Sequence, residues 1–244
     1  MLEIIDYGGG NLGSMTRCLE RLDIPYKRVG GSGRSSVSAQ PSGNYPLLFP
    51  GVGAFGAAMQ HLHDRALTDR IRGLVNDGVP YLGVCIGLQV LFESSEEAPD
   101  VPGLGLLPGV IKHYRRGKVP QIGWNALKEG PIKLNSALTT NDPLNKASTE
   151  ENLATLSPLE AKRQALRVFV AQQGESATAY FVNSYYPVPD APELTLFTAD
   201  YYGDFCAAAQ LIDSQRNITA FQFHPEKSGP FGHQLIQEWM THVV

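Results

Sequence analysis

The sequence predicts a single α/β domain in which a mixed, mostly parallel sheet is flanked by helices. In the first half of the 244-residue chain, short β-rich runs alternate with helical patterns, which is typical of a parallel sheet with helices on its faces. The second half is richer in strands, and a final amphipathic pattern closes the chain. An apolar content of 43% is enough for a substantial core, so we expect one domain over residues 1–244.

The expected elements follow one another along the chain. A strand over residues 2–5 precedes a helix whose apolar face carries Leu12, Met15, Leu19 and Leu22. Next come strands in "YKRV" and "YPLLF", a helix with Leu67, Ile71, Leu74 and Val75, and a strand, turn and helix in "PYLGVCIGLQVLFE". The later strands lie in "VPQIGWNAL", "ATAYFVNSYYPV", "LTLFTA", "FCAAAQLI" and "ITAFQFHPE", and the last helix in "FGHQLIQEWMTHV".

Residues 129–176 interrupt this rhythm. They are mostly polar, and only the part from Leu159 to Val170 suggests a helix. A structureless loop of this length is uncommon inside a compact domain. Because the stretch has too few apolar residues to make a core of its own, we expect a surface insertion and not a second domain.

The composition argues against several classes of partner. A net charge of −4 gives no electrostatic footprint for nucleic acid or an anionic membrane, and no apolar run approaches the roughly 20 residues of a membrane span. The first strand starts at residue 2, so we expect no signal or transit peptide.

The chain has three cysteines, Cys18, Cys85 and Cys206, which is an odd number, and they lack metal-ligand spacing. We therefore expect a reducing compartment, the cytoplasm or, in a plant or alga from which a transit peptide was removed, a plastid, with neither disulfides nor a metal site.

The sharpest chemical signal is "YLGVCIGLQ", in which Cys85 lies between Gly83 and Gly87 where a strand turns into a helix. Small residues on both sides permit the strained turn of a nucleophile elbow, and the N-terminus of the helix favours a thiolate. A buried structural cysteine with glycines beside it by chance is the alternative. Cys18 and Cys206 we assign to packing.

A cysteine nucleophile needs a base and a group that orients the base. In "FQFHPEKSG", His224 and Glu226 are two residues apart, so on an extended segment their side chains point to the same face. His224 could take the thiol proton and Glu226 could hold the imidazole tautomer. The backbone N–H of Ile86 and the glycine loop of Gly51 and Gly53 are candidate donors to an oxyanion.

A glycine loop after the first strand, Gly8-x-Gly10-x-x-Gly13, also matches a dinucleotide-binding fingerprint. No Asp or Glu follows at the distance that would hold the ribose, so a nicotinamide enzyme is the less favoured alternative.

Taken together, the motifs resemble the class I, triad-type glutamine amidotransferases, and most closely the glutaminase subunits or domains of imidazole glycerol phosphate synthase. In the order of that family, the chain has "DYGGGNL", "PGVGAFG", "GVCIGLQVLFESSEE", "VPQIGWN", "YFVNSYYPV" and "FHPEKSG", which cover nearly all of it outside residues 129–176. The resemblance implies that the glycine loop binds no nucleotide, that no cofactor is used, and that a cyclase subunit or fused cyclase domain is the partner.

The resemblance also implies residue roles. Cys85 would be the nucleophile, His224 the base and Glu226 the orienting acid. The positions that match those holding the substrate glutamine are Gly51, Gly53, Gln89, Glu97, Ser184 and Tyr185. The positions that match the contact with the cyclase are Asn11, Trp124, Tyr180 and Lys227.

Two positions depart from the family pattern, because Gln121 and Asn183 stand where the family usually has His. Neither belongs to the triad, so we expect hydrolysis to survive while regulation by the partner stays open. The remaining alternatives are an amidotransferase subunit of another synthase, of the anthranilate or purine type, and a catalytically silent regulatory module.

Overall fold

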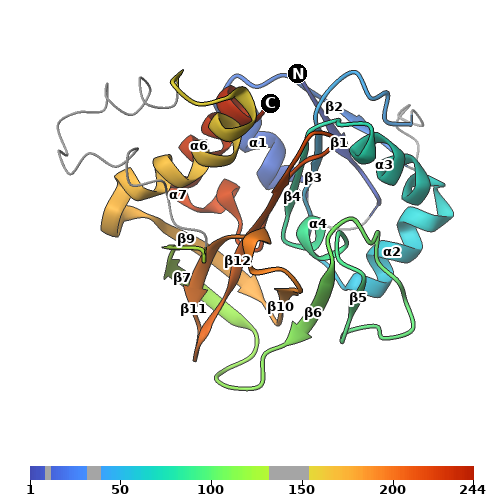
Figure 1. Ribbon diagram of the computed structural model, residues 1–244. Helices are drawn as coiled ribbons and strands as arrows, with labels where there is room; N and C mark the ends of the chain where they lie inside the picture. The colour runs from blue at the N-terminus through green and yellow to red at the C-terminus, as the bar shows by residue number, and fades with distance from the viewer. Residues whose placement is uncertain (9–11, 32–39, 132–153) are drawn as a thin grey trace.

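The computed structural model describes residues 1–8, 12–31, 40–131 and 154–244. Its centre is an eight-stranded sheet with the order β2-β1-β3-β4-β13-β12-β11-β8 (Figure 1). The first five strands in this order run parallel, and the other three join antiparallel. The strands are β1 Leu2–Ile5, β2 Tyr26–Val29, β3 Leu47–Phe49, β4 Tyr81–Val84, β8 Lys128–Glu129, β11 Thr195–Asp200, β12 Asp204–Ile212 and β13 Asn217–Phe221. This confirms the mixed, mostly parallel sheet.

Two smaller sheets lie beside the central one. A three-stranded sheet has the order β10-β6-β5, and β7 pairs with β9 in an antiparallel ribbon. Their strands are β5 Ser94–Ser95, β6 Gly109–His113, β7 Gln121–Ala126, β9 Thr178–Asn183 and β10 Tyr185–Pro189. The expected run "ATAYFVNSYYPV" is therefore two strands, which separate at Ser184. The sequence did not indicate β5 and β6, because short runs with few apolar residues give little periodicity.

Helices cover both faces of the central sheet, with α1, α6 and α7 on one side and α2 and α3 on the other (Figure 1). Their apolar faces form two core clusters, one with Met15, Leu166 and Leu235 and one with Phe55, Leu62 and Ile71. The helices are α1 Gly13–Arg21, α2 Phe55–Asp64, α3 Leu67–Asn76, α4 Ile86–Gln89, α6 Pro158–Gln173 and α7 Gly229–Glu238. Short 3₁₀ helices are η2 Gly174–Ser176, η3 Pro192–Leu194 and η4 Pro225–Lys227, and a π-helical segment, η5 Trp239–Val243, follows α7.

Helix α6 lies within residues 129–176, where the sequence predicts a surface insertion that contains a helix. The helix is present, and its inward face is buried in the core with α7 and β12. Ser157 and Glu160 form a capping box that fixes where α6 begins. Burial of this face is hard to read from sequence, because Ala165, Leu166 and Val168–Val170 are flanked by long polar side chains. Residues 132–153 lie outside the described part of the chain.

Among the described residues, no helix has the length and apolarity that crossing a membrane requires.

Candidate active site

Cys85 lies in a strained turn between β4 and α4. Its backbone has φ 55° and ψ −103°, a conformation that side-chain-bearing residues rarely adopt. A Cβ atom on Gly83 would overlap the Gly87 carbonyl oxygen, and one on Gly87 would overlap the Phe49 carbonyl oxygen. Both glycines are therefore needed for α4 to pack this closely on β3 and β4. This is the local geometry expected of a nucleophile elbow.

The sheet order brings Cys85 and His224 together. Strand β4 pairs in parallel with β13, and their carboxyl ends meet because Val84 lies opposite Phe221. The Cys85 N–H donates to the Phe221 carbonyl at 2.7 Å, which ties the elbow to the segment that leads into His224. Residues from opposite halves of the sequence thus reach the same edge of the sheet.

His224 is held by Glu226. Its Nδ1 lies 2.9 Å from the Glu226 Oε1, and both side chains are nearly inaccessible to solvent. The other ring nitrogen, Nε2, is buried without a hydrogen-bond partner of good geometry among the described residues. Since Nδ1 is occupied, Nε2 is the nitrogen left for the Cys85 thiol. Catalytic contacts are often loose before substrate binds, which fits this arrangement.

The charge on His224 depends on these neighbours. Burial by itself lowers the pKa of the imidazole, but interactions with the Cys85 thiolate and the Glu226 carboxylate outweigh it and raise that pKa to about 10. The His224 imidazole is therefore held in its protonated form at neutral pH. A protonated imidazole beside a cysteine favours the imidazolium–thiolate ion pair, in which the sulfur is nucleophilic.

Gln222 is a site residue that the sequence analysis missed. Its side chain is fully buried, and its Nε2 donates to the Cys85 Sγ at 3.7 Å. Its Oε1 accepts a hydrogen bond from the Gln89 Nε2 at 3.1 Å. The signal that could have revealed it is a glutamine inside the otherwise apolar run "ITAFQF", where a buried polar group needs partners.

A pocket of about 300 Å³ opens in front of Cys85. Its size suits an amino-acid-sized molecule. Of the residues expected to hold substrate, five line it with the cysteine: Gly53, Gln89, Glu97, Ser184 and Tyr185. The Glu97 Oε2 also accepts from the Phe55 N–H at 2.6 Å, so this carboxylate caps α2 while it faces the pocket.

Gly51 lies behind the pocket wall. A Cβ atom there would come within 2.8 Å of the Tyr7 hydroxyl and 3.0 Å of Ile86. The Tyr7 hydroxyl donates to the Val52 carbonyl at 3.1 Å. Because a trans peptide sets its C=O and N–H in opposite directions, the Gly53 N–H points away from the tyrosine ring. The other candidate donor, the Ile86 N–H, is the first of α4 and has no intrahelical acceptor.

The two departures from the family pattern face each other. Gln121 on β7 is directly opposite Asn183 on β9, and both are buried. The Tyr114 hydroxyl links them, since it donates to the Gln121 Oε1 at 3.0 Å and accepts from the Asn183 Nδ2 at 3.1 Å. Asn183 also donates to the Tyr185 carbonyl at 3.0 Å. The pair thus forms one hydrogen-bonded unit between the ribbon and the pocket wall.

Three of the expected partner-contact residues lie on the ribbon or beside it. Trp124 on β7 is 58% exposed, and its ring meets that of Tyr180 edge to face with centroids 5.9 Å apart. Ile122, two residues before Trp124, is 62% exposed. Lys227 is exposed on η4 and directly follows Glu226. Asn11 lies outside the described residues.

Comparisons with known proteins agree with this geometry. The family model described as "Glutamine amidotransferase class-I" matches residues 3–243, and the chain belongs to this class of enzymes, the glutamine amidotransferases. Two solved structures of glutamine amidotransferases share the fold over nearly the whole of this chain. One has 17% identity, a TM-score of 0.57 and 97% of each chain covered. The other, from Thermotoga maritima, has 13% identity and a TM-score of 0.52, with 98% of this chain and 80% of that chain covered.

Curated relatives narrow the class. Each of two is named imidazole glycerol phosphate synthase subunit HisH. The protein of Geobacillus thermodenitrificans is 36% identical, with 100% of this chain and 97% of the relative covered. That of Thermus thermophilus is 35% identical, with 94% of this chain and 91% of the relative covered. Within the class I glutamine amidotransferases, the chain belongs to the HisH family.

Proposed function

We propose that this chain is the glutaminase subunit of an imidazole glycerol phosphate synthase. It hydrolyses glutamine to glutamate and ammonia and passes the ammonia to a cyclase partner. The cyclase makes imidazole glycerol phosphate and an aminoimidazole carboxamide ribotide in histidine biosynthesis. The observation that carries the proposal is the buried His224–Glu226 pair beside a strained cysteine at the wall of an amino-acid-sized pocket.

Acylation uses the ion pair. The Cys85 thiolate attacks the carboxamide carbon of glutamine, and the π electrons move to the oxygen. The N–H groups of Ile86 and Gly53 donate to this oxyanion. As the intermediate collapses, the C–N bond breaks and the His224 imidazolium gives its proton to the departing nitrogen, which leaves as ammonia. A γ-glutamyl thioester remains on the sulfur.

Hydrolysis of the thioester completes the cycle. Neutral His224 takes a proton from water, and the resulting hydroxide adds to the thioester carbonyl. The C–S bond then breaks, its electron pair returns to the sulfur, and glutamic acid leaves and loses its proton to solvent. Glu226 fixes the imidazole through both stages. These groups account for every proton and electron pair, so we expect neither metal nor cofactor.

Different pocket residues bind different parts of the glutamine molecule. One oxygen of the Glu97 carboxylate caps α2. The other oxygen can accept a hydrogen bond from the α-ammonium group of glutamine. Gln89 and the backbone of Ser184 and Tyr185 offer hydrogen-bonding groups to the rest of the molecule. Gly51 supports this wall from behind.

The exposed apolar face of the ribbon supports a contact with the cyclase. Pro120, which precedes β7, and Val182 on β9 both line the pocket. The exposed side chains of Ile122 and Trp124 on β7 therefore lie next to the pocket. A partner seated on this face would cover the pocket mouth and keep ammonia away from water, which would otherwise protonate and dilute it. Tyr180, Lys227 and Asn11 complete the proposed contact.

The test uses the complex of this chain with its cyclase. Cys85→Ala removes the atom that forms the thioester, so product formation from glutamine should fall by several orders of magnitude. Synthesis with an ammonium salt, at a pH that leaves free ammonia, should stay near the wild-type rate because the cyclase site is on the partner.

The matched control is Cys206→Ala, which changes a buried cysteine in the other core cluster. It should keep both rates. Loss of the ammonium rate in Cys85→Ala, or survival of its glutamine rate, would contradict the proposed function.

A further inference from the structure

A chain of hydrogen bonds runs from the pocket to the sulfur of Cys85. The Gln89 Nε2 donates to the Tyr185 carbonyl at 3.4 Å and to the Gln222 Oε1 at 3.1 Å. The Gln222 Nε2 then donates to the Cys85 Sγ at 3.7 Å.

The direction of this chain is fixed by its first member. A backbone carbonyl can only accept, so the amide nitrogen of Gln89 faces Tyr185 and Gln222. The Gln222 oxygen must therefore face Gln89, and its N–H group must face the sulfur. The orientation of a side-chain amide is thus set by the network and has a single consistent solution.

Burial makes the Gln222 side chain costly to keep unless its bonds are made. Gln222 is 0% exposed and Gln89 is 5% exposed, and a buried amide without partners loses several hydrogen bonds to water. The backbone N–H of Gln222 donates to the Ala207 carbonyl at 2.9 Å, and this bond anchors the Gln222 backbone to β12. Gln222 and His224 are two residues apart and both reach Cys85, as the period of an extended chain allows.

We propose that Gln222 is a hydrogen-bond donor to the Cys85 thiolate and couples it to the substrate residue Gln89. The inference rests on the proposed function. It applies at two stages, because the sulfur is negative both before it attacks glutamine and again when the C–S bond of the thioester breaks. In the thioester the sulfur is neutral and accepts a hydrogen bond weakly, so the donor favours the two charged stages selectively.

Other titratable groups also face this sulfur. His224 follows β13, Tyr7 follows β1, Glu226 stands behind His224, and Glu97 lies across the pocket. A variant of Gln222 leaves all four in place, so a change in thiol reactivity can be assigned to the lost donor.

The test is the rate at which iodoacetamide alkylates Cys85 in the full-length chain, measured by peptide mass spectrometry across pH 5 to 10. Cys18 and Cys206 should react slowly, because burial raises the pKa of their thiols to about 11 and about 12. Gln222→Met keeps an unbranched side chain of similar volume and removes the N–H. We expect the curve of alkylation rate against pH to be displaced to higher pH by about one unit.

Gln210→Met is the matched control, since Gln210 is also buried, lies on the adjacent strand β12, and has an Nε2 with no hydrogen-bond partner among the described residues. Its alkylation curve should match that of the wild type. In the complex, Gln222→Met should lower kcat for glutamine more than it raises KM.

Gln222→Glu is the second variant. It replaces Gln222→Met in the test if the absence of a cooperative unfolding transition shows that Gln222→Met is not folded. It keeps the acceptor for Gln89 and replaces the donor with a carboxylate, so it should slow alkylation at least as much. A folded variant whose curve overlaps that of the wild type overturns the inference. Failure of the proposed function is seen separately, as absent glutaminase activity in the wild-type complex with an unchanged alkylation difference.

Discussion

At the scale of single residues, His224 carries a proton that its surroundings make hard to remove. The ordinary value of an imidazole pKa is 6.5; burial lowers it, but the thiolate of Cys85 and the carboxylate of Glu226 raise it to about 10 in the folded chain. A group whose pKa is higher in the folded state stabilises that state when protonated. This contribution is complete below about pH 6.5 and is lost as the pH rises through 10.

Unfolding experiments can measure that contribution. The free energy of unfolding of the wild type, minus that of His224→Gln, should be largest near pH 6.5 and should shrink steadily towards pH 10. In a Cys85→Ala background the dependence should be weaker, because the thiolate is the leading cause that raises the pKa. A difference that stays constant across this range in the wild-type background would contradict the assigned ion pair.

The clustering of Cys85, His224 and Glu226 could be predicted from sequence because each of them belongs to a short motif with its own local logic. The glycines around Cys85 predict a tight turn, and the spacing of His224 and Glu226 fits one extended segment. Gln222 could not be predicted in this way. Its partners are 133 and 137 positions away in the sequence, so only the pairing of β4 with β13 shows what its amide binds.

At the scale of elements, substitutions in α6 can measure how much its buried face and its exposed N-terminal end each contribute to stability. Leu166 is fully buried in the helix, whereas Ser157 caps it at an exposed end. Leu166→Ala should cost about 3 kcal/mol of unfolding free energy, because it leaves a cavity in the core. Ser157→Ala should cost about 1 kcal/mol, the usual value for a lost N-cap. Urea unfolding of both variants provides the measurement.

A helix that merely covered a surface insertion would give a different ranking. Both variants would then cost similar small amounts, and removal of α6 would leave the cooperative transition intact. The expected ranking instead assigns α6 to the core of the domain.

The strands of the central sheet could be predicted because buried parallel strands are short, continuous apolar runs. Burial of α6 could not, since it depends on the face that β11 and β12 present to it. Likewise β6 is identified by its pairing with β10, and its own sequence of Gly109–His113 carries little signal. Local patterns thus specified the elements, while packing across the sheet decided which of their faces are buried.

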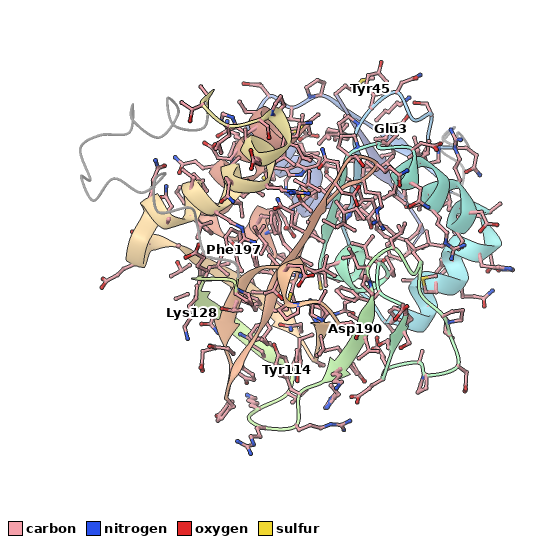
Figure 2. The ribbon with its side chains drawn as sticks, viewed as in Figure 1. Glu3, Tyr45, Tyr114, Lys128, Asp190 and Phe197 are labelled. Carbon is pink, nitrogen blue, oxygen red and sulfur yellow. The ribbon has the colours of Figure 1, made fainter. Side chains whose placement is uncertain are left out.

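At the scale of the whole molecule, the ribbon of β7 and β9 is the surface proposed to meet the cyclase. Trp124→Ala should weaken that association at least about 30-fold, because a large exposed aromatic is the typical anchor of an interface. Tyr45→Ala is the control, since Tyr45 is a half-buried aromatic at the end of the molecule opposite Tyr114, which bonds to β7 (Figure 2).

Titration calorimetry of each variant with the cyclase distinguishes the two faces. Equal affinity losses for Trp124→Ala and Tyr45→Ala would place the contact elsewhere, as would no loss for either. Glutaminase activity of the isolated chain should change little in Trp124→Ala, since its ring contacts Tyr180 on the outer surface and does not line the pocket.

The adjacency of β4 and β13 has a consequence for how the enzyme is made. The strand that carries Cys85 is translated well before the strand that precedes His224, although the two strands are neighbours in the sheet. Until β13 inserts beside β4, the nascent polypeptide holds a cysteine that lacks its imidazole, its carboxylate and the donor at Gln222. Such a thiol is an ordinary, weakly nucleophilic one. The topology therefore brings Cys85 next to His224, Glu226 and Gln222 only after β13 has joined the sheet, when the surrounding core can shield the sulfur from oxidants and electrophiles.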